Sequence, residues 1–509
     1  MLKNIICRIL PTATAIMLLS ACGSEVSIPQ DASPAEEEAR IYPDYRDITI
    51  PPNIAPLNFR IDGGGEEFVA RIGNEASEVI TAASKDGIVK MDSTEWRNLL
   101  AENRGRDLSV SLYAKKDGQW LKYPDYKLSV AKEAIDPYLS YRLIEPGYEL
   151  YRQVGLYQRN LSSFEQKPIY ENNRSYDSIN NHCVNCHNFQ NYDTKRMIFH
   201  VRAKHGGTII ADNGKVKKVN MKCDSILSST VYPTWHPTKP WIVFSSNQTG
   251  QAFHVVDKQK VEVMDYGSDL VFYDAEANTL TNILKTEADL ETFPAFSPDG
   301  KKLYYCSAHV AQFEGKTTAQ RMDMVINIDD SIRYNVMSMT FDPATRRFGQ
   351  PVMEVDCAAM GKSASVPRVS PDGRYLLFTL GDYGQFHIWH KSADLYVKDL
   401  KTGEVRPLKE ANSPDVDSYH AWSSNGRWIV FSSRRDDGDF TRLYVSYFSP
   451  DGRSHKAFII PQESPQENIM LMKSYNVPEF TKSPVTVTPE DFRSAVYNDE
   501  AAEKVTYRK

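Results

Sequence analysis

Residues 367–373 read PRVSPDG, and the apolar run YLLFT follows at 375–379. The same order of strand, tight turn and apolar strand recurs at 233–246, 294–307 and 419–433. An Asp-Gly or Asn-Gly pair in three of the four units supplies the positive φ angles that a hairpin turn needs. A second hairpin follows each unit, so every unit offers four strands. Four-stranded units in tandem predict a β-propeller.

These units resemble the WD-like repeats of TolB-type β-propellers, whose signature is Ser-Pro-Asp-Gly, and the match covers residues 232–460. Upstream, a strand at 196–202 and the hairpin after it predict a fifth blade. Residues 141–170 would form a sixth blade with the segment near 470–480, so that both ends of the domain close the ring. We therefore predict an all-β chain in which residues 136–485 form a TolB-like propeller of about six blades.

The segment before the propeller, residues 47–135, reads as short alternating strands, and one helix-like piece at 93–102 interrupts them. This pattern predicts a small β-sandwich of the immunoglobulin-like kind, which would act as a spacer or docking domain. Residues 22–46 are rich in Pro, Glu and small residues, which predicts a flexible linker. Residues 486–509 are expected to be a C-terminal tail.

The N-terminus has the layout of a secretory signal. Lys3 and Arg8 flank the start of an apolar run that is too short to span a bilayer as a helix. Residues 19–22 read LSAC and resemble the lipobox of bacterial lipoproteins. The resemblance implies removal of residues 1–21, lipidation of Cys22, and a place in the cell envelope as an outer-membrane lipoprotein on the periplasmic or surface face. The alternative is an ordinary signal peptide with a chance cysteine.

Composition narrows the partners and the redox chemistry. The chain has 60 Lys and Arg residues against 66 Asp and Glu residues, a net charge of −6 at pH 7, which argues against nucleic acid as a partner. Seven cysteines in 509 residues are too few for a disulfide scaffold. Cys306 lies in an apolar strand and is expected to be a buried small hydrophobe. The expected partners are the membrane, through the lipid, and a redox or other protein of the envelope.

Residues 183–187 read CVNCH, the spacing of a c-type haem attachment site. Two thiols at this spacing can each add to a vinyl group of haem, and the adjacent imidazole can then bind the iron. The motif therefore predicts covalent haem c on Cys183 and Cys186, with His187 as the proximal iron ligand. A structural zinc site would need further ligands nearby, and a thioredoxin-like dithiol would need a βαβ setting.

The motif lies just before the strand of the fifth blade, so the haem would be attached to the propeller itself. Met197 is expected on one face of that strand, while His200 and Arg202 share the other. Because guanidinium pairs well with carboxylate, Arg202 is expected to meet a haem propionate. As the distal iron ligand we rank His200 first, His205 in the following turn second, and Met197 third. The alternative for His200 is a hydrogen-bonded core histidine.

The whole arrangement resembles a group of Bacteroidetes-type lipoproteins that combine a TolB-like propeller with one haem-attachment motif. The resemblance implies a membrane-anchored c-type haem protein for electron transfer or redox sensing in the envelope. The alternative is a binding module, in which the propeller grips a protein or glycan and the haem is secondary. An enzyme is not favoured, because no Gly-x-Ser-x-Gly elbow occurs and residues 436–439 read as a solvated turn rather than a calcium loop.

Overall fold

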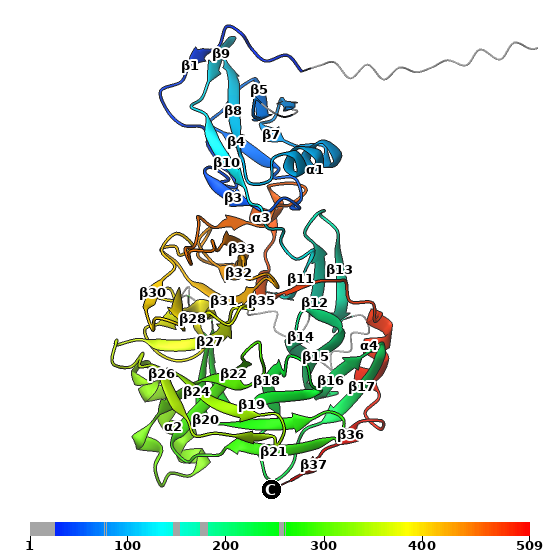
Figure 1. Ribbon diagram of the computed structural model, residues 1–509, viewed down its shortest axis with the longest axis vertical. Coiled ribbons are helices and arrows are strands. Elements are labelled where there is room, and N and C mark those ends of the chain that lie inside the picture. The colour runs from blue at the N-terminus through cyan, green and yellow to red at the C-terminus, as the bar shows by residue number, and fades with distance from the viewer. Residues whose placement is uncertain are drawn as a thin grey trace, which may run out of the picture.

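The computed structural model describes residues 26–75, 77, 79–145, 153–173, 182–253, 259 and 261–508. Strands dominate this part of the chain (Figure 1), which confirms the prediction of an all-β protein. The described α-helices are α1 (Ser93–Glu102), α2 (Thr318–Ile328), α3 (Glu467–Met470) and α4 (Pro489–Tyr497). Within the described ranges, no helix combines the length and the apolar character that a membrane span requires. The predicted signal peptide and Cys22 lie outside the described residues.

The N-terminal unit consists of ten short strands and α1. The strands are β1 (Ser33–Pro34), β2 (Arg40–Tyr42), β3 (Ile48–Ile50), β4 (Phe59–Asp62), β5 (Glu67–Gly73), β6 (Ile80–Ser84), β7 (Ile88–Val89), β8 (Asp107–Lys116), β9 (Gln119–Lys122) and β10 (Tyr126–Val130). One sheet runs β1-β9-β8-β10-β3, with β5 paired to β8 and β6 paired to β5, and the other runs β2-β4-β7. Helix α1 starts after Asp92, whose carboxylate accepts hydrogen bonds from two backbone N–H groups. The helix buries Trp96 against this unit's core.

Part of the predicted linker, 22–46, belongs to this unit. Strand β1 pairs in parallel with β9, with Ser33 opposite Leu121. Ile41 and Tyr45 are buried in the apolar core. The physical reason for the difference is that these few apolar side chains have a core to enter, although the average composition around them is that of a linker.

All but three of the other strands of the described chain form six units of four strands each. The first unit is β35 (Ser474–Thr481), β11 (Tyr138–Ile144), β12 (Val154–Asn160) and β13 (Gln166–Glu171). The second is β14 (His182–Gln190), β15 (Asp193–Ala203), β16 (Gly207–Asp212) and β17 (Lys215–Asn220). The third is β18 (Thr230–Trp235), β19 (Trp241–Phe253), β20 (Val261–Asp274) and β21 (Thr279–Leu284).

The fourth unit is β22 (Asp289–Phe296), β23 (Lys302–His309), β24 (Asn335–Asp342) and β26 (Val352–Val355), with β25 (Arg347–Phe348) as a side hairpin. The fifth is β27 (Ser363–Val369), β28 (Tyr375–Gly381), β29 (Asp394–Asp399) and β30 (Val405–Pro407). The sixth is β31 (Asp417–Trp422), β32 (Trp428–Ser433), β33 (Arg442–Tyr447) and β34 (Phe458–Ile459). A single pairing, Ser268 with Leu290, joins the third and fourth units into one sheet.

The innermost strand of each unit contacts the innermost strands of its two neighbours. In order around the centre these strands are β14, β18, β22, β27, β31 and β35, and β35 contacts β14 again. Because β35 pairs with β11, residues 474–481 and 138–144 share one sheet, as the predicted closure by both ends requires. The arrangement is β-propeller-like, and it brings six strands from distant parts of the sequence to one central axis.

The C-terminal segment, 486–509, is more than a tail. Helix α4 buries Phe492 and Val496 against the second unit. Beyond it, β36 (Glu503–Lys504) adds an edge strand to β17, and β37 (Thr506–Tyr507) adds one to β21. The N-terminal unit is docked as well, since the Lys456 ammonium donates to the Asp44 carboxylate and to the Arg46 carbonyl, both at 2.9 Å. These contacts hold both ends of the chain against the central units.

An ion-paired carboxylate between the fourth and fifth units makes the stability of this body pH-dependent. Although burial opposes it, hydrogen bonds from Lys302, Lys398 and Ser338 lower the pKa of Glu354 to about 2. A lowered pKa in the folded state gives stability that is complete above the unfolded pKa and is lost as pH falls through the folded one. In Glu354→Gln, we expect a loss of about 1–2 kcal/mol at pH 7 that shrinks below pH 4.5 and vanishes only below pH 2. Urea unfolding at several pH values measures it, with exposed Glu404→Gln as the control, and a pH-independent loss would contradict the assignment.

Candidate functional site

A central cavity of about 1470 Å³ lies where the six innermost strands meet. Each of these strands contributes side chains to its lining, and so do parts of β11, β15, β19 and β20. The cavity is lined by the three residues that carry the chemistry of the predicted haem motif: Cys183, Cys186 and His187. A large concave site with a few convergent polar groups is the usual form of a ligand pocket, so the cavity is the candidate functional site.

Each innermost strand turns one side chain into the cavity through a backbone irregularity. Six lining residues have φ between 47° and 54°, one in each innermost strand, and they are Cys186, Tyr232, Phe293, Val366, Tyr419 and Val477. In every unit the strand register shifts at this point. A non-glycine residue with positive φ is strained and uncommon, and such positions concentrate at functional sites. Cys186 thus occupies the position that aromatic or branched apolar residues take in the other five units.

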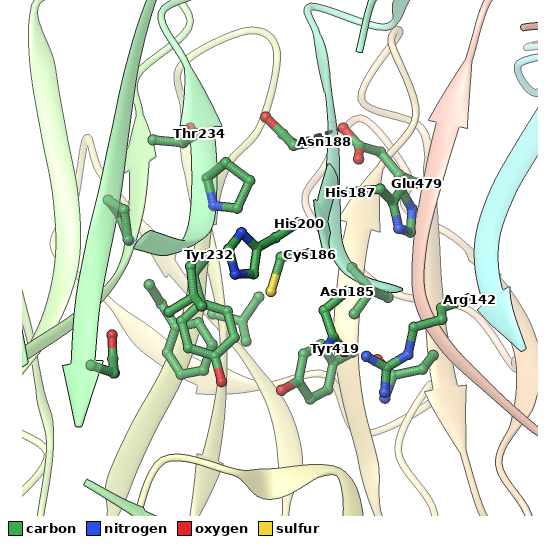
Figure 2. A pocket seen from close by; sticks show the side chains of 18 of the residues that line it. Arg142, Asn185, Cys186, His187, Asn188, His200, Tyr232, Thr234, Tyr419 and Glu479 are labelled. Carbon is green, nitrogen blue, oxygen red and sulfur yellow. Dashed lines mark hydrogen bonds between the residues drawn. The ribbon is translucent and has the colours of Figure 1, made fainter. Parts of the chain in front are cut away.

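The two cysteines of the motif are free thiols on β14. Cys183 is buried and its sulfur accepts a hydrogen bond from the Asn185 side chain at 3.2 Å. Burial raises the pKa of the Cys183 thiol, and the positive charges of Arg142 and Arg202 oppose that rise. In Figure 2, Cys186 lies on the side of β14 that faces His200 and Tyr232.

His187 lies on the other side of β14, toward Glu479 and Arg142 (Figure 2). Neither of its ring nitrogens has a hydrogen-bond partner among the described residues, although the side chain is only 4% exposed. Burial, and then the charge of Arg142, lower the pKa of His187 to about 3, so the ring is neutral at physiological pH. A neutral imidazole with free nitrogens is a suitable metal ligand.

The structure separates the four other candidate residues of the haem site. His200 and Arg202 line the cavity, whereas Met197 is fully buried with Phe199 in the core on the opposite face of β15. His200 is paired across the sheet with Asn185, and burial lowers its pKa to about 3. His205 is not part of the cavity lining, and its Nδ1 contacts the carboxylate of Asp499 at 2.8 Å. The geometry therefore brings together the thiols, His187, His200 and Arg202.

Among the lining residues that the sequence did not indicate, two charged ones lie near His187 (Figure 2). Arg142 on β11 reaches the cavity from the unit that closes the ring, and Glu479 on β35 accepts hydrogen bonds from the Asn188 side chain and the Phe189 backbone at 2.9 and 3.0 Å. Burial raises the pKa of Glu479 to about 7. Both residues come from strands far from the motif in sequence. Arg142 and Glu479 lie near the motif only because β11 pairs with β35, so no local sequence pattern could have indicated their position.

Comparisons with known proteins yield a limited result. No known family profile and no curated protein matches the chain. Among solved structures it is similar to the tricorn protease (12% identity over 80% of this chain and 43% of that one, TM-score 0.33). It is also similar to an oligogalacturonate lyase in complex with manganese (12% identity over 67% of this chain and 86% of that one, TM-score 0.29). The chain spans less than half the length of the tricorn protease. Likeness at this level assigns no activity.

Proposed function

We propose that the six four-stranded units are the blades of a TolB-like β-propeller, and that the protein is an envelope binding module with its ligand site in the central cavity. One observation carries the proposal. Buried polar atoms in proteins nearly always have hydrogen-bond partners. Several buried polar atoms around this cavity have no hydrogen-bond partner among the described residues. They belong to Arg142, His187, Trp235, Asn247, His420 and Asn476. Because unpaired buried polar groups are costly, small side-chain movements that expose these atoms to a ligand with donors and acceptors would be favourable.

The test fills the cavity without disturbing the blades. Val366 stands three positions around the ring from Cys186, and three of the six ring positions already carry an aromatic side chain at positive φ. Val366→Trp is therefore expected to fold and to occupy the centre of the cavity. Native mass spectrometry of the protein purified from its own host should detect a bound ligand in the wild type and at least a tenfold lower occupancy in the variant.

The control is Val352→Trp, the same substitution on an outer strand where the valine is 56% exposed. It should retain the ligand in full. Equal occupancy in Val366→Trp and the wild type, or no bound ligand in the wild type, would refute a central binding site.

A second candidate is a lipid-anchored c-type haem protein, for which haem c on Cys183 and Cys186 is the cavity's occupant. The specific observation is His187, whose two buried ring nitrogens lack partners in the same cavity that both thiols line. The cavity, the two thiols and the imidazole together fit a covalently attached haem. Cys183 and Cys186 would hold it covalently and His187 would ligate the iron. His200 is one of the two other lining histidines that could supply the second ligand. Haem bound there would supply one-electron chemistry for electron transfer or redox sensing.

The binding module comes first because of the position of His187. Cys186 and His187 leave β14 on opposite sides (Figure 2), so thioether attachment and iron ligation together require this short segment to rearrange. A ligand held by the side chains that already line the open cavity needs no such rearrangement of β14. In either case the chain surrounds its ligand with neutral imidazoles and apolar ring side chains, which exclude water from the bound group.

A further inference from the structure

We propose that Arg142 and Arg202 form an anion-binding end of the central cavity, which receives a carboxylate or phosphate group of the ligand. The inference rests on the proposed function of the cavity as a ligand site and specifies the chemistry of its occupant. It involves two cations from different units: Arg142 on β11 of the first and Arg202 on β15 of the second.

Strand pairing places both arginines beside the same thiol. Arg202 is the cross-strand partner of Cys183, and both residues line the cavity. Arg142 is the partner of Asn476 on β35, and β35 contacts β14, the strand of Cys183. The two charges both act on the Cys183 thiol and on the Tyr419 hydroxyl. The two guanidinium groups therefore converge on one end of the cavity.

Within the part of the chain that the structure describes, Arg142 has no counter-ion. The described residues offer it no ion pair, and its Nε, which is buried, has no hydrogen-bond acceptor. Of the three carboxylates that line the cavity, Glu145 is paired with Lys473 at 2.6 Å, Glu479 accepts from Asn188, and Asp224 is an exposed loop residue that forms no ion pair with Arg142. A half-buried guanidinium without an acceptor is costly, because its planar donors match a carboxylate or phosphate.

Side chains close to Arg142 supply further hydrogen-bond donors for an oxyanion. Figure 2 shows Arg142 directed toward Asn185 and the ring of Tyr419, whose hydroxyl lies at the far end of the ring from Arg142. An amide N–H₂ group and a phenol can each donate to an oxyanion. Together with two guanidinium groups they form a set of donors that favours a charged oxygen over a neutral one.

The experiment measures the local potential with two alkylating reagents of similar size. Iodoacetate is anionic and iodoacetamide is neutral, and both react with the same thiolate, so the ratio of their rates at Cys183 does not depend on the pKa of the thiol. The protein is the chain without lipid or haem, in a Cys186→Ala background, and mass spectrometry of the Cys183 peptide gives the rates. Arg142→Gln is expected to lower the ratio of iodoacetate to iodoacetamide rates by about fivefold.

Matched variants keep the test specific. Arg142→Lys keeps the charge and should keep the ratio, and Arg347→Gln removes an exposed arginine on β25 and should leave it unchanged. An unchanged ratio in Arg142→Gln, in a variant that unfolds at the wild-type temperature, overturns the anion site. This result is independent of whether native mass spectrometry finds a ligand, so failure of the binding function and failure of the anion site are distinguishable.

A protection assay identifies the source of the oxyanion. Hemin, its dimethyl ester and inorganic phosphate are each tested for slowing the reaction of Cys183 with iodoacetamide. Stronger protection by hemin than by its ester, lost in Arg142→Gln, supports the site and identifies its anion as a haem carboxylate. Protection by phosphate that Arg142→Gln abolishes supports the site with a phosphate-bearing ligand. Protection by any of the three that is equal in Arg142→Gln and the wild type counts against the site.

Discussion

The Cys183→Ala/Cys186→Ala double variant is expected to lose covalent haem completely. In a host that attaches haem c, the wild-type chain should give a band by in-gel haem staining after denaturation, and the variant should give none. The physical reason is that thioether bonds survive denaturation, whereas a haem held by iron ligation alone is released when the fold is lost. A pyridine haemochrome spectrum gives the haem content per chain and checks the gel result.

Two controls make this result specific. Cys223 lines the same cavity as a free, half-buried thiol, so Cys223→Ala should stain as the wild type does. His187→Ala should keep the covalent haem but change its absorption spectrum, because attachment and ligation are separate roles. Absence of staining in the wild type would contradict the haem candidate and leave the binding module as the function of the cavity.

The parts of the fold that depend on local signals were predictable from the sequence. Turns such as Asp372-Gly373 determine a hairpin within a few residues, and the apolar strands beside them have only one way to become buried. The closing unit was predictable from a global requirement, since a ring needs its last sheet to be completed by one end of the chain.

Other features have no local signal. The φ of 54° at Cys186 follows from the place of β14 at the centre, where each innermost strand must bulge. Arg142 and Cys183 lie close to each other because β11 pairs with β35 and β35 contacts β14. The assignment of His200 and Met197 to opposite faces was predictable, because alternation in a strand is local. Which face meets the cavity is decided only by packing.

The second large effect concerns the membrane anchor. Cys22→Ala is expected to move the protein almost entirely from the membrane fraction to the soluble fraction of the envelope. Cys22 lies outside the described residues, and the expectation rests on the lipobox at residues 19–22. Cell fractionation followed by immunoblotting measures the distribution. The matched control is Cys7→Ala, which replaces a cysteine of the same signal segment outside the lipobox and should leave the protein in the membrane.

The size of this effect follows from the number of acyl chains. A single chain binds a bilayer only marginally, with an association constant of about 10⁴ M⁻¹, and stable anchoring takes at least two. A lipidated N-terminal cysteine of the lipobox type carries three chains, so its removal should convert firm anchoring into release instead of a partial shift. If Cys22→Ala stays in the membrane fraction after a high-salt wash, lipid is not the anchor. If it is released by salt alone, protein contacts contribute to membrane binding, because salt screens electrostatic attraction and leaves acyl chains in place.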